Sequence, residues 1–213
     1  IGLLAFILPV FVTVSHRMIP FFATNVIKGY ERWRPFWILA AYWAVSITLL
    51  AAELCEEPHA TAVAALLLAA ITGLMTFKWW PGAAAPGLFW VLIIAFAWAP
   101  VGFALESLAA MGIQLGRAPD HALTVGFAAG LVIAMVTRVT QGHSGRPLVM
   151  PRVAWLAYSG VQLATLARVW AGVADESSAW LVLATTLLTI AVLPWTLRNG
   201  LIYMRPRIDG EQG

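Results

Sequence analysis

The chain has 213 residues, of which 61% are hydrophobic and only 11% are charged. A soluble domain is about 45–50% apolar and about 25% charged, so this composition excludes a soluble globular domain and a disordered chain. The net charge of +3 comes from short basic clusters between apolar segments, which indicates membrane topology and no nucleic-acid partner. A lone cysteine, Cys55, excludes a disulfide scaffold. What remains is a protein embedded in a lipid bilayer, with room for roughly seven spans of about 20 residues.

Seven apolar segments follow one another along the chain, and none shows the two-residue alternation of a β-barrel strand. Each is predicted to be a transmembrane helix, because a helix satisfies its own backbone hydrogen bonds inside the bilayer. The short connections predict antiparallel neighbours within one all-α integral-membrane domain that covers residues 1–213, a polytopic bundle of about seven helices. In chain order the predicted helices cover residues 3–22 (continuing to about 27), 35–54, 60–77, 87–109, 121–139, 153–172 and 179–204.

The charged residues between the predicted helices alternate in sign. Acidic clusters such as Glu53, Glu56 and Glu57 follow the even-numbered helices, and basic residues follow the odd-numbered ones. Because Lys and Arg gather in cytoplasmic loops, the N-terminus is predicted to lie outside and the C-terminus in the cytoplasm. Tryptophans near the helix ends, such as Trp79 and Trp80, fit an interfacial belt. The basic residues behind this topology are Lys28, Arg32, Arg34, Lys78, Arg138, Arg146, Arg152, Arg198, Arg205 and Arg207.

Polar residues interrupt the first predicted helix at Ser15, His16 and Arg17. A polar side chain inside the membrane is costly, so it indicates function by default. Pro20 lacks the N–H that would bond to the His16 carbonyl, which leaves an acceptor free beside the imidazole. Two interpretations are open. Either His16 is a ligand in the inner half of the bilayer, or the first helix is short and Arg17 extends to the inner surface.

A stripe of small residues follows His121 along the fifth predicted helix. Ala122, Gly126, Gly130 and Ala134 recur every four residues, so they share one helix face. Small residues allow two helices to approach closely in lipid, and a bare face also suits the flat ring of a cofactor. The pattern leaves both interpretations open and favours helix packing.

The loop after the fifth helix combines two glycines with Arg138, His143 and Arg146. Guanidinium groups and free backbone N–H groups suit an anion such as a carboxylate or a heme propionate, whereas the alternative is an ordinary cytoplasmic loop that follows the charge rule. His121 and His143 are 22 residues apart, or about 30 Å along a helix, so they cannot ligate one metal. His59 lies in an acidic outer loop and is predicted to be a solvated turn residue.

These segments resemble the NnrS family of bacterial inner-membrane proteins. The similarity lies in residues 15–22 (SHRMIPFF), in residues 121–126 running to 137–139, in residues 142–148 (GHSGRPL) and in the tail at 205–210. It covers essentially the whole chain but only the C-terminal half or so of a typical member. An N-terminal half or a partner subunit is therefore expected to complete the bundle. The resemblance implies a heme- and copper-containing inner-membrane protein of the nitric oxide response, associated with denitrification and relief of nitrosative stress.

With this resemblance the histidines are ranked as ligands of heme or copper. His121 is expected to be an axial heme ligand, because it opens the helix that carries the bare face of Gly126 and Gly130. Asp120 or a nearby carbonyl is expected to orient its second nitrogen. The remaining residues, in order of expectation, are His143 and His16 as ligands of a second metal or heme, with Arg17, Arg138 and Arg146 as propionate or anion partners, and His59 last.

Three functions are compatible with these residues. The first is a heme protein whose iron binds nitric oxide, a small neutral gas that partitions into lipid. The second is a transporter without redox chemistry, because helices broken at proline can line a substrate site with unwound backbone. The third is a scaffold that anchors a partner. The prolines that favour the transporter are Pro9, Pro20, Pro100 and Pro194.

Overall fold

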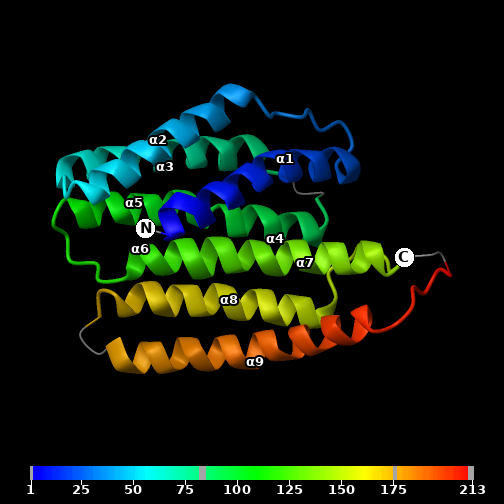
Figure 1. Ribbon diagram of the computed structural model, residues 1–213. Coiled ribbons are helices and arrows are strands. Elements are labelled where there is room, and N and C mark those ends of the chain that lie inside the picture. Colours follow the sequence, from blue (N-terminus) through cyan, green and yellow to red (C-terminus); the bar gives the residue numbers. More distant parts are fainter. Residues whose placement is uncertain (1, 82–84, 175–176, 211–213) are drawn as a thin grey trace.

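The structure is a computed structural model that describes residues 2–81, 85–174 and 177–210, and the regular elements in these ranges are all helices (Figure 1). They form seven long rods, which confirms the predicted all-α bundle. Three rods carry more than one label because they are interrupted or contain π-helical turns, written η. In chain order the rods are η1 with α1 (Leu3–Ile7 and Leu8–Val26), α2 (Phe36–Leu54), α3 (Pro58–Trp79), α4 with α5 (Gly87–Phe96 and Trp98–Ala110), α6 with η2 and α7 (Ala118–His121, Ala122–Ala129 and Gly130–His143), α8 (Arg152–Ala171) and α9 (Ser177–Tyr203).

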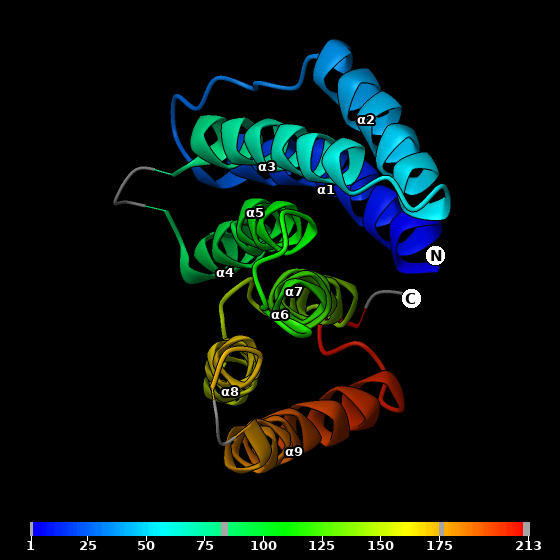
Figure 2. The ribbon, with the colours of Figure 1, turned by 90° about the vertical axis from the view of Figure 1, so that its left-hand side faces the viewer.

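The rods lie side by side in layers (Figures 1 and 2). Helices α1, α2 and α3 cover one side of the molecule, α8 and α9 cover the other, and α4, α5 and α7 lie between them. Rods that follow one another along the chain run antiparallel, as predicted. The most extensive contacts join α8 to α9, α3 to α5 and α2 to α3. The main hydrophobic core is formed by α1 to α5, η2, α7 and the first half of α8, with Trp195 of α9.

Among the described residues, six rods are long and apolar enough to cross a membrane, so the chain is a multi-pass membrane protein. The exception is α8, in which Tyr158, Gln162 and Arg168 lower the hydropathy. This helix packs against both η2 and α9, and Tyr158 is buried. Part of its surface therefore faces protein and not lipid. The helix predicted at 153–172 is present, with a less apolar surface than its neighbours.

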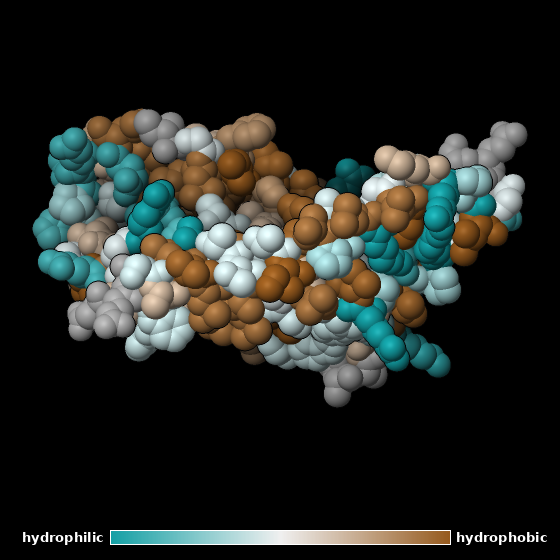
Figure 3. All heavy atoms as spheres, turned by 90° about the horizontal axis from the view of Figure 1, so that it is seen from below, coloured by the Kyte–Doolittle hydropathy of each residue, from teal (hydrophilic) through white to brown (hydrophobic). Residues whose placement is uncertain are grey.

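The charged loops separate onto the two ends of the bundle. The connections at 55–57, 111–117 and 172–174 lie at one end, which we call the acidic end (Figure 1). The loops at 27–35 and 144–151, together with the tail after α9, lie at the other, which we call the basic end. Figure 3 shows hydrophilic residues at both ends and hydrophobic residues over much of the band between them. Glu53, Glu56, Glu57 and Glu106 lie together at the acidic end, where the one loop arginine, Arg117, pairs with Asp120. The other loop arginines and lysines among the described residues lie at the basic end, as the positive-inside rule predicts.

The sidedness of the bundle is a testable prediction. The described tail leaves α9 at the basic end, so a reporter enzyme fused behind Gly213 is expected to be active only in the cytoplasm. A second reporter inserted after Glu56, in the acidic turn between α2 and α3, is expected to be active only outside, because Lys and Arg are retained on the cytoplasmic side. The opposite pair of signals would contradict this orientation.

Two prolines lie within helices that continue past them. Helix α1 runs through Pro20 and α9 runs through Pro194. A break does occur at Ala97, between α4 and α5, because Pro100 has no N–H for the carbonyl of Phe96. The expectation of broken helices is therefore wrong at Pro20 and Pro194, and the transporter interpretation loses unwound backbone at both places.

Candidate functional site

His16 lies in the half of α1 nearer the basic end, and its side chain is only 2% exposed. Its Nε2 is 3.1 Å from the carbonyl oxygen of Pro35, the residue before α2. A carbonyl oxygen can only accept, so Nε2 carries the hydrogen and donates it. In the neutral imidazole Nδ1 then keeps its lone pair. One nitrogen held by a carbonyl and the other left as an acceptor is the usual arrangement of a metal-binding histidine.

Aromatic rings surround the imidazole of His16. The ring centroids of Trp79 and Phe36 lie 6.3 and 6.4 Å from its centroid. Trp79, at the end of α3, is fully buried and donates its indole N–H to the carbonyl oxygen of Trp33 at 3.0 Å. Side chains from α1 and α3 thus hold the loop before α2 at two points, Trp33 and Pro35. The prediction that Trp79 belongs to an interfacial belt is wrong, since its ring packs in the core.

The length of α1 decides between the two interpretations of its polar residues. The helix continues to Val26, about 15 Å beyond His16. The interpretation of a short first helix is therefore wrong. Arg17 is exposed, whereas Ser15 and His16 are buried. Of the adjacent histidine and arginine, His16 alone faces the protein interior.

Arg138 on α7 is a charged residue that is only 8% exposed. Its guanidinium carbon lies 3.9 Å from the centroid of the Phe22 ring on α1. The negative face of an aromatic ring stabilises a desolvated cation by up to about 2 kcal/mol. The contact joins α7 to the segment of α1 that follows His16. We expected the Arg138 guanidinium to bind an anion. In the structure one of its faces packs against the Phe22 ring.

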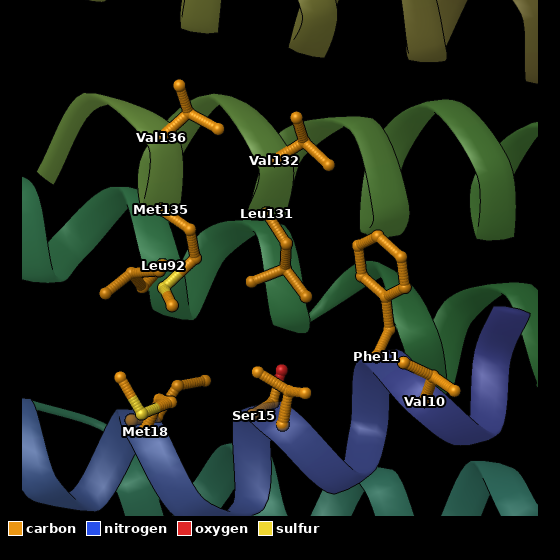
Figure 4. Close-up of a pocket in the computed structure, with 11 residues that line it drawn as sticks. Val10, Phe11, Ser15, Met18, Leu92, Leu131, Val132, Met135 and Val136 are labelled. Carbon is orange, nitrogen blue, oxygen red and sulfur yellow. The ribbon is translucent and has the colours of Figure 1, made fainter. Parts of the chain in front are cut away.

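An apolar cavity of about 220 Å³ lies between α1 and α7 (Figure 4). Ser15 and Met18 of α1 face Leu131 and Met135 of α7 across it. Ser15 contributes a hydroxyl to a lining that is otherwise hydrophobic. Pockets for drug-sized ligands measure roughly 300–1,000 Å³, and smaller apolar cavities bind small apolar molecules. The cavity therefore suits a small neutral molecule and not a ligand of porphyrin size.

The small-residue stripe of η2 and α7 packs against protein side chains. A Cβ atom at Gly126 would lie 2.5 Å from Cγ of Trp98 and 2.9 Å from Cγ2 of Thr165. A Cβ atom at Gly130 would lie 3.0 Å from that of Ala95. The packing interpretation of the stripe is thus confirmed at both glycines. For a porphyrin edge to reach this face, Trp98 would have to move.

The histidine that we ranked first, His121, ends α6 at the acidic end and is half-buried. The neighbouring carboxylate of Asp120, which we expected to orient His121, forms an ion pair with Arg117 at 3.3 Å. The full length of one rod separates His121 from His143. The prediction that these two histidines cannot share a metal is therefore confirmed.

The remaining histidines are both exposed. His143 ends α7 at the basic end and borders an open hollow of about 290 Å³ together with Arg205 and Arg207. His59 lies in the first turn of α3 at the acidic end. Its exposure confirms the predicted solvation, whereas its place in the helix differs from the predicted loop. The structure therefore distributes the four histidines over both ends of the bundle and assembles no cluster from them.

Comparison with known proteins identifies the family of the chain. A model of the NnrS protein family matches residues 1–207. The chain belongs to the NnrS family. No curated protein and no solved structure matches it. In this NnrS chain, the segments that carry the resemblance fold into the turn of α1 around His16 and into the rod formed by η2 and α7.

The NnrS resemblance implies heme and copper, and the donor groups of the chain fit the two differently. A heme iron is held by one or two axial ligands, and His16 offers a buried imidazole whose Nδ1 is an acceptor. In the part of the chain that the structure describes, no three His, Cys, Asp or Glu side chains form a group that could hold a metal ion. The donor chemistry of His16 suits an axial heme ligand, but the cavity between α1 and α7 is too small for a porphyrin, and the described residues by themselves form no metal centre with three protein ligands.

Three residues of the site in this NnrS chain were not predicted from the sequence, namely Pro35, Trp79 and Phe22. Pro35 is 19 residues from His16, and Trp79 and Phe22 meet their partners across helix interfaces. No local spacing links such residues. The sequence did point to the site through two polar residues that need partners inside the membrane, His16 and Arg138.

Proposed function

We propose that this NnrS chain is a heme-binding protein of the bacterial inner membrane that acts in the response to nitric oxide, with His16 as an axial heme ligand. The environment of His16 carries the proposal, because the imidazole is buried and its Nε2 donates to the carbonyl of Pro35. Membership in the NnrS family supports the role in the nitric oxide response. A bound heme supplies an iron that can take a small neutral ligand.

The residues around His16 have distinct roles in this proposal. The carbonyl of Pro35 orients the imidazole and makes Nδ1 a stronger donor to a metal. The fully buried ring of Trp79 packs beside the imidazole and keeps water away from it. Arg138 rests on Phe22 and is a candidate partner of a heme propionate, as are the more exposed Arg17 and Arg146 named above.

The cavity between α1 and α7 supports the same function. Its lining is uncharged and almost entirely apolar, and Ser15 places it one residue from His16 on α1. Nitric oxide is small and neutral, so it partitions into lipid and from there into an apolar cavity that is open to the surface, as this one is at Val10, Val14 and Val132. We propose that the cavity admits nitric oxide from the bilayer to the site.

Copper stays a proposal that rests on the family resemblance. His121 and His143 are the candidate ligands, and they lie at opposite ends of the bundle. A copper ion there would take its further ligands from the N-terminal half or partner subunit that the resemblance leads us to expect. Denitrification and relief of nitrosative stress are the processes in which we place such a protein.

The test compares the heme content of alanine variants of the four histidines. The wild-type protein, purified from heme-replete cells, is expected to show a Soret band that shifts when nitric oxide is added to the ferrous form. His16→Ala is expected to lose most of that band because it lacks the axial ligand, and added imidazole is expected to restore part of it. His59→Ala is the matched control, since His59 is exposed and is expected to keep the band.

The result for His121→Ala separates the two ligand assignments. A band lost in His121→Ala and kept in His16→Ala would support the ranking made from the sequence and overturn the role of His16. A wild-type protein without any Soret band would contradict heme binding itself. Circular dichroism of each variant distinguishes a lost ligand from a lost fold.

A further inference from the structure

A polar cluster joins α7, α9 and the loop after α7 at the basic end. Arg198 on α9 donates from Nη2 to Oε1 of Gln141 at 3.2 Å and from Nη1 to Oδ1 of Asn199 at 3.1 Å. Arg146 in the loop donates its backbone N–H to the carbonyl oxygen of Gln141 at 2.9 Å, so both arginines lie beside Gln141. We call Gln141, Arg146, Arg198 and Asn199 the arginine cluster.

The arginine cluster has more hydrogen-bond donors than acceptors. Asn199 is 4% exposed, and its Nδ2 is buried without a hydrogen-bond partner in the described structure. Nη1 of Arg146 is buried and unpaired in the same way. The two amide oxygens of the cluster already accept from Arg198. Buried donors in folded proteins nearly always find an acceptor, so the excess indicates that an acceptor-rich group belongs here.

The described residues supply no carboxylate to the arginine cluster. Their ion pairs join Arg117 to Asp120 at the acidic end and Arg207 to Asp209 in the tail. Asp209 approaches the neighbouring loop at Gly145, where its carboxylate is held by Arg207. Arg146 and Arg198 are both partly buried, so their charges repel in a medium that screens them less than water does. An anion between them would remove that repulsion.

We propose that the arginine cluster binds a phosphate group, supplied in the membrane by the headgroup of an anionic lipid. Guanidinium groups present their N–H donors in a planar fork that matches phosphate oxygens. Arg198 lies near the end of α9, and basic pockets between helices on the cytoplasmic side of a membrane bind anionic headgroups. The site is separate from His16, and in this assignment Arg146 binds the lipid phosphate in place of the heme propionate for which it is a candidate above.

The experiment measures lipid binding to the full chain in detergent, with phosphatidylglycerol or phosphatidylcholine added. Native mass spectrometry and thermal unfolding are expected to show preferential binding of phosphatidylglycerol to the wild-type protein. Arg198→Gln is expected to weaken that binding about tenfold, as the loss of a charge-assisted hydrogen bond would. Arg198→Lys is expected to restore part of it. The matched control is Arg152→Gln, which removes the same charge from an exposed position at the same end and is expected to bind normally.

Several results would overturn the proposal. One is an unchanged lipid preference in Arg198→Gln, and another is an equal loss in Arg152→Gln, which would show a general charge effect. If inorganic phosphate raises the melting temperature as much as phosphatidylglycerol does, and the lipid adds nothing, the ligand is a free phosphate and the lipid assignment falls. A loss of heme in Arg198→Gln without a change in lipid binding would assign the cluster to heme propionates instead. If Arg198→Gln does not fold, the second variant is Arg146→Gln, which changes a half-exposed residue of the loop.

Discussion

Replacing Gly126 by leucine is expected to destabilise the folded bundle by about 3 kcal/mol, at the upper end of the usual cost of overpacking. The first added carbon would lie 2.5 Å from Cγ of Trp98 and 2.9 Å from Cγ2 of Thr165. Trp98 cannot swing aside freely, because its indole N–H donates to Oε1 of Gln162 at 2.7 Å. The new side chain must therefore push η2 away from its neighbours. Thermal unfolding in detergent, followed by circular dichroism, measures the effect.

Two other glycines calibrate this prediction. Gly130→Leu is expected to lower the melting temperature less than Gly126→Leu, since its first added carbon would lie 3.0 Å from Cβ of Ala95. Gly200→Leu is the matched control, because nothing lies within 4 Å of the added carbon on α9. Equal melting temperatures of Gly126→Leu and Gly200→Leu would show that the helix face of Gly126 contacts lipid and not Trp98.

The helices could be predicted from the sequence because each of them is a long apolar segment, and a chain of this composition has few other ways to satisfy its backbone in lipid. The helix ends were less predictable. The fifth helix was expected at residues 121–139, and the rod in fact runs from Ala118 to His143. Hydropathy marks the apolar middle of a rod, whereas its polar final turns are fixed by backbone hydrogen bonds. The π-helical turns η1 and η2 have no hydropathy signature at all.

The candidate site could be predicted only in part. His16 was found because a histidine in an apolar helix is conspicuous, but its burial depends on Trp79 and Pro35, which reach it from other helices and loops. The sequence placed His121 first because of the bare face formed by Gly126 and Gly130. That face serves packing in the structure, and periodicity alone cannot distinguish a face that meets a tryptophan from one that meets a cofactor.

Replacing Trp79 by alanine is expected to cost the folded protein about 3–5 kcal/mol, as is usual for a buried tryptophan. The indole is fully buried and packs on Phe96 with ring centroids 4.9 Å apart. The neighbouring Trp80 is 52% exposed, so Trp80→Ala removes the same side chain and is expected to cost far less. Equal melting temperatures for the two variants would contradict the role of Trp79 in the core.

A milder change separates the packing of Trp79 from its hydrogen bond. Trp79→Phe keeps a ring in the core but cannot donate to the carbonyl of Trp33, so it is expected to cost about 1 kcal/mol for the hydrogen bond, with a further loss for the smaller ring. The loop at 27–35 should then open more often, because its second attachment, from His16 to Pro35, remains alone. Trypsin is expected to cut this loop faster than in the wild-type protein. An unchanged cutting rate in Trp79→Phe would show that the contact of His16 with Pro35 is sufficient to hold the loop. In that case His16→Ala, which removes this contact, is expected to open the loop.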